Sequence, residues 1–224
     1  MDKTTVNTQH GKNGKRFRAV VLGVSTGGVD ALKRLLPALP AAYSLPVLVV
    51  IHMAPGSGDG LAKLLDELAE IHVKEADEGE FIKAGVVYLA PANYHLLLES
   101  NGQLALSIDT VVNFARPAID VLFESAAASF GSALIGVILT GAANDGARGL
   151  ERIRQLGGYT IVQDPADALM DSMPRNALAH ADRVVRLDEL PALLTYLEGV
   201  SVADNLNRET SASANGASSE TEKP

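Results

Sequence analysis

Short apolar segments and amphipathic segments alternate along most of the chain. The apolar segments are rich in Val, Ile and Leu and are bounded by turn residues, which is typical of buried strands. We predict strands at residues 18–24, 46–51, 86–90, 134–139, 159–163 and 184–187. Between them, apolar residues recur at helical spacing. We predict helices at residues 29–39, 61–70, 118–130 and 147–156, with Pro117 in the first turn of the third and Asp188 capping a further, last helix.

Strands that alternate with helices indicate a mostly parallel sheet covered on both faces, so we predict an α/β, doubly wound fold. One region departs from this pattern. Residues 86–90, 95–99 and 104–108 are joined by short segments that contain Asn93 and Asn101-Gly102. These short connections predict an antiparallel β-hairpin excursion beside the parallel sheet.

The two ends of the chain differ from its middle in charge and composition. The formal net charge is −8, with +4 on residues 1–18 and −2 on residues 200–224, so the residues between carry −10. Neither end has apolar periodicity. We therefore expect a disordered basic arm at residues 1–16, one folded domain at residues 17–198 and a disordered tail at residues 199–224.

Composition excludes several classes of protein. The chain contains no cysteine, which excludes disulfides, a cysteine nucleophile and thiolate metal sites. An acidic balance with 4% aromatic residues argues against nucleic-acid binding. The apolar runs are shorter than the roughly 20 residues that span a bilayer, so we expect no membrane insertion.

The first predicted strand leads into a candidate nucleophile. Gly23-Val24-Ser25-Thr26-Gly27 matches G-x-S-x-G between a strand and a helix, where a sharp turn exposes the serine hydroxyl. The following helix N-terminus favours negative charge at the same place. The simpler alternative is a glycine-rich turn that binds a phosphate or only packs.

Two further residues follow other strands at the same edge of the sheet. His52 follows the second strand and is a candidate general base; His95, which begins a strand, is its rival. Asp145 follows the strand at 134–139 and could orient an imidazole, although it, or Asn144, could equally cap the next helix. Sites in parallel sheets form beyond the carboxyl ends of the strands. The pattern therefore predicts a serine hydrolase. Its candidate residues occur along the chain in the order Ser, His, Asp, which differs from the order Ser, Asp, His of α/β-hydrolases.

Residues 20–194 resemble the catalytic domain of the chemotaxis-type protein-glutamate methylesterases (CheB-type). The resemblance is carried by six segments in the family's order: VLGVSTGG, HMAPG, LLDELAEIHVKEADEGEFIKAGVVYLAPANYH, ARPAIDVLFESAA, LTGAANDGARGL and VQDPADALMDSMPRNAL. It implies hydrolysis of glutamate methyl esters on the cytoplasmic helices of methyl-accepting chemoreceptors, with release of methanol. Deamidation of receptor glutamines is a further implied activity.

The resemblance also implies the roles of individual residues. Ser25 would be the nucleophile, His52 the base and Asp145 the orienting acid, with Ala142 and Thr26 at the oxyanion. The reaction would need no metal or organic cofactor, and the protein would be cytoplasmic. The net charge of −10 on the central residues adds a separate hypothesis: an acidic rim near the site would favour release of the demethylated product, although the same charge could equally be solvated surface.

The chain departs from the family in two respects. Ala142 and Ala143 replace the Met and second Gly of the family's L-T-G-M-G-x-D-G loop, and Ala143 would be strained if that position needs a positive φ. Only about sixteen residues precede the first strand, too few for a receiver domain. We therefore expect a stand-alone catalytic domain, constitutively active or controlled by a separate regulatory protein. A weak or inactive methylesterase-like module that binds receptors or signalling partners is the alternative, and a nucleotide- or phosphate-binding enzyme is a more distant one.

Overall fold

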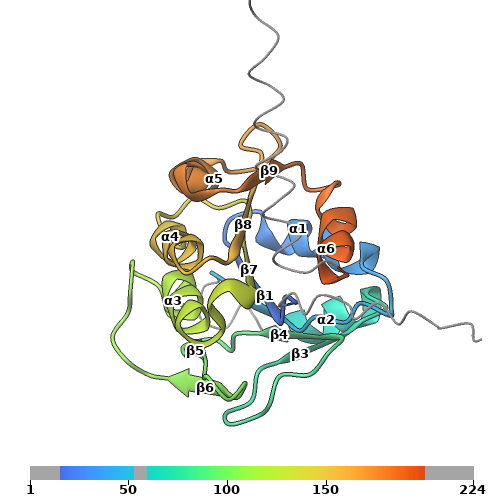
Figure 1. The fold of residues 1–224 in the computed structure, drawn as a ribbon, viewed down its shortest axis with the longest axis vertical. Helices are drawn as coiled ribbons and strands as arrows, with labels where there is room; N and C mark the ends of the chain where they lie inside the picture. The colour runs from blue at the N-terminus through green and yellow to red at the C-terminus, as the bar shows by residue number, and fades with distance from the viewer. Residues whose placement is uncertain (1–15, 53–59, 200–224) are drawn as a thin grey trace, which may run out of the picture.

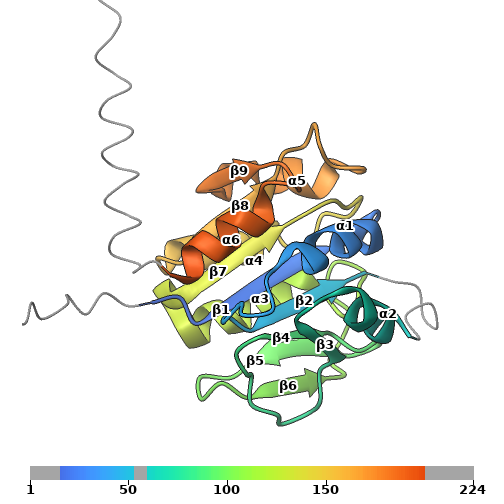
Figure 2. The same ribbon diagram turned by 90° about the vertical axis from the view of Figure 1, so that its right-hand side faces the viewer.

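The fold is an α/β sandwich built around one parallel sheet (Figures 1 and 2). The computed structural model describes residues 16–52 and 60–199. The arm and the tail expected from the sequence lie outside these residues, except for Arg16 and Gly199. Within the described part of the chain, no helix has the length and apolar character needed to cross a membrane.

Seven strands form the central sheet, and all of their pairings are parallel. In sheet order they are β3 (His72–Glu75), β4 (Val86–Leu89), β2 (Val47–Ile51), β1 (Ala19–Val24), β7 (Leu134–Ile138), β8 (Tyr159–Gln163) and β9 (Arg183–Val185). The central strands are buried on both faces, as expected for a parallel sheet covered by helices. Two more strands, β5 (His95–Leu98) and β6 (Leu104–Ser107), pair antiparallel in a separate small sheet.

Helices cover the two faces of the sheet as separate layers (Figure 1). One layer contains α1 (Gly28–Leu35), α2 (Leu61–Leu68) and α6 (Leu190–Glu198). The other contains α3 (Ile119–Phe130), α4 (Ala147–Gln155) and the short α5 (Ser172–Ala177). Single 3₁₀ turns follow three elements, at Leu36–Ala38, Gly131–Ala133 and Leu178–His180.

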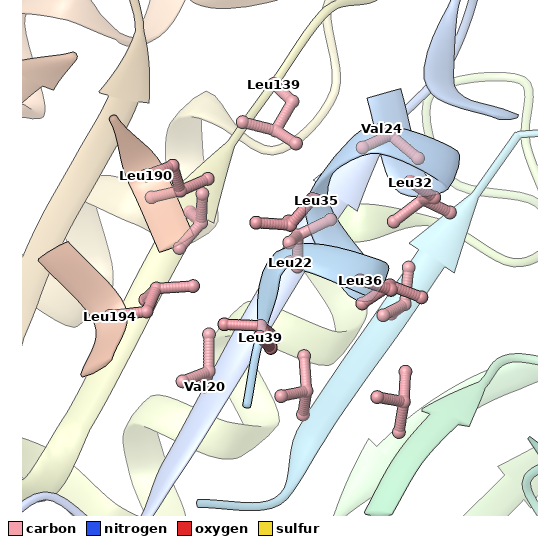
Figure 3. Close-up of a cluster of buried hydrophobic side chains, with 14 of the residues drawn as sticks. Val20, Leu22, Val24, Leu32, Leu35, Leu36, Leu39, Leu139, Leu190 and Leu194 are labelled. Carbon is pink, nitrogen blue, oxygen red and sulfur yellow. The ribbon is translucent and has the colours of Figure 1, made fainter. Parts of the chain in front are cut away.

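Alternate residues of β1 divide the core into two halves. Val20, Leu22 and Val24 point toward α1 and α6, where they meet leucines of both helices (Figure 3). Ala19 and Val21 belong to the cluster beneath α3 and α4. This alternation follows from the two-residue period of a strand. Burial on both faces therefore fixes the register of β1 and the position of the turn that follows it.

The structure confirms the predicted fold class and corrects several details. β4 joins the parallel sheet, so the antiparallel excursion consists of β5 and β6 only. β3 was not predicted because it is a short edge strand whose four residues, HVKE, lack an apolar run. Pro117 precedes the N-cap residue Ala118 instead of lying in the first turn of α3, and Glu189 instead of Asp188 occupies the N-cap of α6.

The carboxyl ends of three neighbouring strands lie at one level. The register pairs Val24 with Ile51 and Gly23 with Ile138, so the residues that follow β2 and β7 flank the turn after β1. The chain leaves β1 for β2 on one side and later returns to β7 on the other, which makes this the topological switch point of the sheet.

Gly23 gives α3 room to approach this switch point. A Cβ atom at Gly23 would lie 2.4 Å from Cγ2 of Ile119, at the start of α3. We expect Gly23→Ala to lower the free energy of unfolding by about 1–3 kcal/mol, because Ile119 must move in a closely packed core. Urea denaturation measures this change. Gly199→Ala is the control, since its Cβ would meet only ordinary contacts. Equal stability of the two variants would contradict the account.

Candidate active site

Ser25 occupies a sharp turn between β1 and α1. The carbonyl of Ser25 accepts a hydrogen bond from the N–H of Gly28 at 2.7 Å, which closes a four-residue turn. Gly27 has φ 82° and ψ −1°, the conformation of the third position of a type II turn and one that favours glycine. The N–H of Ser25 donates to the carbonyl of Thr140 at 3.0 Å, which ties the turn to the end of β7. Ser25 is partly exposed.

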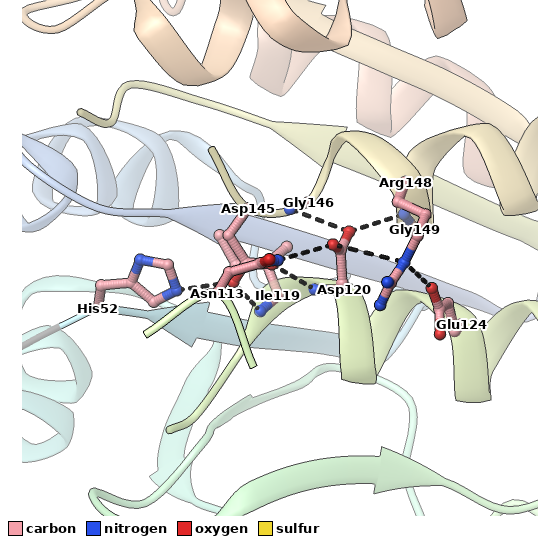
Figure 4. A network of polar contacts seen from close by, with 9 residues as sticks. All are labelled: His52, Asn113, Ile119, Asp120, Glu124, Asp145, Gly146, Arg148 and Gly149. Carbon is pink, nitrogen blue, oxygen red and sulfur yellow. Dashed lines mark hydrogen bonds and ion pairs between the residues drawn. The ribbon is translucent and has the colours of Figure 1, made fainter. Parts of the chain in front are cut away.

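His52 lies directly beside this turn. Its N–H donates to the carbonyl of Val24 at 3.1 Å, which continues the β1–β2 pairing by one residue. Its Nε2 lies 2.9 Å from Oδ2 of Asp145 (Figure 4). An ionised carboxylate only accepts hydrogen bonds, so Nε2 carries the proton and Nδ1 retains a lone pair.

Asp145 is buried and accepts four hydrogen bonds. Oδ2 accepts from His52 Nε2 and, at 2.6 Å, from the N–H of Ile119. Oδ1 accepts from Nδ2 of Asn113 at 2.8 Å and from the N–H of Asp120 at 3.1 Å. These contacts fix the direction in which the carboxylate faces the imidazole. They also set aside the helix-cap alternative, because Gly146 is the N-cap of α4 and no side chain caps it locally.

The pKa values of Asp145 and Asp120 shift in opposite directions. Burial alone would raise the pKa of Asp145, but hydrogen bonds from His52, Asn113 and two backbone N–H groups outweigh it and lower that pKa. Burial raises the pKa of Asp120, and the nearby charge of Asp145 adds to this rise. Asp145 therefore remains ionised at neutral pH. Its ionisation favours folding above its ordinary pKa of about 3.9, an effect lost as the pH falls through the lower folded value.

The two residues that the resemblance implies at the oxyanion, Thr26 and Ala142, have backbone N–H groups available for a ligand. The N–H groups of Ser25, Gly28 and Gly141 already donate to backbone carbonyls. Those of Thr26 and Ala142 have no acceptor among the described residues. Both residues are exposed. An exposed N–H group with no acceptor in the protein can donate to a ligand. Such groups at an accessible turn are suited to binding an anionic oxygen.

A cavity of about 430 Å³ opens next to His52. Its lining includes Asn113 and Ala143 but, among the described residues, not Ser25. Arg116 also lines it, and none of its described lining residues is acidic. No acidic residue of the expected rim lies in the described lining of this cavity. In the described part of the chain, no group of three or more His, Cys, Asp or Glu side chains could hold a metal ion.

Two expectations about neighbouring residues are resolved by the structure. The rival histidine His95 is buried: its Nε2 lies 3.1 Å from the carbonyl of Thr110, and its Nδ1 accepts from the N–H of Ala118 at 3.2 Å. Backbone groups thus occupy both of its ring nitrogens. Ala143 is not among the residues with positive φ, so the loop does not need glycine there and the expected strain is absent.

Two residues of the site, Asn113 and Asp120, were not expected from the sequence. Asn113 has φ 50° and joins both buried carboxylates through one amide nitrogen. Asp120 accepts from the N–H groups of Gly146 and Gly149 at the start of α4. The sequence offered one indication of them: they lie on either side of the ARPA segment, residues 115–118, which belongs to the family resemblance. Neither residue follows a strand, so the strand pattern did not make them candidates.

Comparisons with known proteins place the chain in one family. The family model described as CheB methylesterase matches residues 20–194. A Leptospira interrogans relative, named for protein-glutamate methylesterase and protein-glutamine glutaminase activities, is 45% identical over 184 residues, 81% of this chain and 95% of the relative. A Symbiobacterium thermophilum protein with the same two activities in its name is 42% identical, over 85% of this chain and 50% of that protein. The chain thus spans about half the length of this second relative.

A solved structure shows the same fold. The crystal structure of the Thermotoga maritima CheB methylesterase catalytic domain matches with a TM-score of 0.78 and 38% sequence identity, and the match covers 81% of this chain and 98% of that one. The family match runs from the second residue of β1 into α6, and so includes the turn that carries Ser25. This chain belongs to the CheB methylesterase family of enzymes.

Proposed function

We propose that this protein hydrolyses glutamate methyl esters on signalling proteins by serine hydrolase chemistry. The observation that carries the proposal is the contact between Nε2 of His52 and Oδ2 of Asp145 at 2.9 Å, made by a histidine whose N–H bonds the carbonyl of Val24, the residue before Ser25. Asp145 holds Nε2–H, so Nδ1 is the nitrogen available for proton transfer with Ser25. Ser25, His52 and Asp145 form the triad in this proposal.

In the first half of the reaction, Ser25 Oγ attacks the ester carbonyl while His52 Nδ1 takes its proton. The carbonyl oxygen becomes an oxyanion, which the N–H groups of Thr26 and Ala142 stabilise. The tetrahedral intermediate collapses, the bond to the methoxy oxygen breaks, and the imidazolium protonates the leaving oxygen. Methanol departs and a glutamyl ester of Ser25 remains.

In the second half, water replaces methanol. His52 Nδ1 takes a proton from the water as its oxygen attacks the acyl carbon, and the same two N–H groups stabilise the new oxyanion. Collapse breaks the bond to Ser25 Oγ, which regains its proton from His52. The product is a glutamate carboxylate. A glutamine side chain in the same place gives glutamate and ammonia, which accounts for the second activity in the relatives' names.

The substrates we propose are the cytoplasmic helices of methyl-accepting chemoreceptors, which is what the sequence resemblance to the chemotaxis-type methylesterases implies. Arg116 lines the cavity beside His52, and no described lining residue is acidic. The charge of this cavity therefore suits a product that carries a carboxylate. We place the reaction in the cytoplasm and assign control of it to a separate regulatory protein. The catalytic chemistry proceeds through side chains and backbone groups of the protein.

One prediction of the proposed function concerns the nucleophile. We expect Ser25→Ala to reduce methanol release from a methyl-labelled receptor fragment by at least about a thousandfold, because the acyl-enzyme cannot form. Volatile radiolabelled methanol measures the rate. The control variant is Ser100→Ala, because Ser100 is an exposed serine in the β5–β6 turn. Ammonia release from a fragment with glutamine at the methylation sites should fall in parallel.

The same assay decides between this proposal and the binding-only alternative. A wild-type protein that binds the fragment but releases no methanol would support the alternative. The structure removes one motive for that alternative, since Ala143 fits its loop without a positive φ. A thermal shift with nucleotides would instead favour the nucleotide-binding hypothesis, which leaves the His52–Asp145 contact unexplained.

A second prediction tests the oxyanion donors. Ala142→Pro removes one backbone N–H, and we expect kcat to fall about a hundredfold or more, as for loss of one oxyanion donor. Ala142→Ser retains the N–H and should lose far less. Circular dichroism checks that both variants fold. Equal kcat values for the proline and serine variants would remove Ala142 from the oxyanion site.

A further inference from the structure

Asn113 links the candidate triad to a second buried acid. The two N–H bonds of its side-chain amide point in different directions: Nδ2 lies 2.8 Å from Oδ1 of Asp145 and 2.9 Å from Oδ2 of Asp120 (Figure 4). Both acceptors are nearly inaccessible, with 1% and 3% residue exposure. Two close carboxylates repel each other, so a shared donor between them lowers the cost of holding both in place.

The backbone around Asn113 has the shape that this contact requires. Val112 and Ala115 exchange two backbone hydrogen bonds, at 3.1 and 2.9 Å, across a two-residue turn. Both turn residues, Asn113 and Phe114, have positive φ, at 50° and 62°. Asparagine tolerates this conformation well, whereas a bulky residue such as Phe rarely adopts it. The turn thus directs the Asn113 amide inward, and Phe114 is fully exposed.

The segment that carries the turn is anchored at both ends. His95 binds the carbonyl of Thr110 on one side and the N–H of Ala118 on the other. Arg116 Nη1 donates to the carbonyls of Ile108 and Asp109, at 2.7 and 3.0 Å. Because both ends are fixed, the position of the Asn113 amide is set by the fold rather than by a free loop.

We propose that Asn113 is a positioning residue for the esterase reaction: its amide bridges Asp145 and Asp120 and holds the Asp145 carboxylate in the orientation that directs Oδ2 at His52. The inference rests on the proposed function, since it assigns Asn113 to the same triad. Loss of the amide leaves Oδ1 of Asp145 with one donor, the N–H of Asp120, and leaves Asp120 facing Asp145 without a donor between them.

The test uses two variants that suit the turn equally but differ in the amide. Asn113→Gly keeps the positive φ and removes the donor. We expect its kcat for the methyl ester to fall about tenfold, with KM little changed. A tenfold loss is the rate equivalent of one hydrogen bond to a charged group. Asn113→Asp also tolerates positive φ but places a third carboxylate against the two acids, and its kcat should fall further. Asn101→Gly is the control, since Asn101 bonds only Gln103 within the β5–β6 turn.

A spectroscopic readout separates positioning from turn formation. The ¹H NMR signal of the His52 Nε2–H that Asp145 accepts should shift or broaden in Asn113→Gly while the melting temperature stays near that of Asn101→Gly. If Asn113 only forms the turn, both of its variants will keep wild-type kcat and an unchanged signal, which overturns the inference. If wild type and Ser25→Ala show equal activity, the proposed triad fails instead, and the NMR result still reports on the Asn113 contact.

Discussion

Two buried carboxylates that cap each other's helices hold this site together. Asp145, just before α4, accepts the N–H groups of Ile119 and Asp120 at the start of α3. Asp120, in the first turn of α3, accepts the N–H groups of Gly146 and Gly149 at the start of α4, at 3.0 and 2.7 Å. Each helix N-terminus therefore receives a negative charge from the neighbouring segment, which satisfies N–H groups that the helix itself leaves unpaired.

Close packing makes this exchange possible. Cβ atoms at Gly23 and Gly146 would lie 2.4 and 2.8 Å from Cγ2 of Ile119, and one at Gly149 would lie 2.4 Å from Cβ of Phe123. The first turns of α3 and α4 can approach the sheet and each other only because these positions lack side chains. The arrangement also explains how Asp145 serves two purposes. It caps α3 with two bonds and still presents Oδ2 to His52.

The sequence was sufficient to predict the fold class, most strands and the three residues that the sheet brings to one edge. Residues that follow neighbouring parallel strands lie at one edge of a sheet, so the strand pattern made Ser25, His52 and Asp145 candidates and left His95 and Asn144 as alternatives. Asn113 and Asp120 could not be found in this way, because neither follows a strand and their contacts join segments up to 32 residues apart. His95 was a candidate base because the sequence does not show what a histidine contacts. Only the fold shows that backbone groups occupy both of its ring nitrogens. β3 was missed because an edge strand need not be apolar.

In our proposal, the anchored carboxylate of Asp145 orients His52 and so makes Ser25 the reactive nucleophile. The most direct measurement is the rate and location of covalent labelling by a fluorophosphonate, read by peptide mass spectrometry. The account predicts one adduct, on the peptide that contains Ser25, and labelling that is slower by orders of magnitude in Asp145→Asn, where an NH₂ group would face the donors around it. An adduct on another residue, or equal labelling rates in the two proteins, would contradict it.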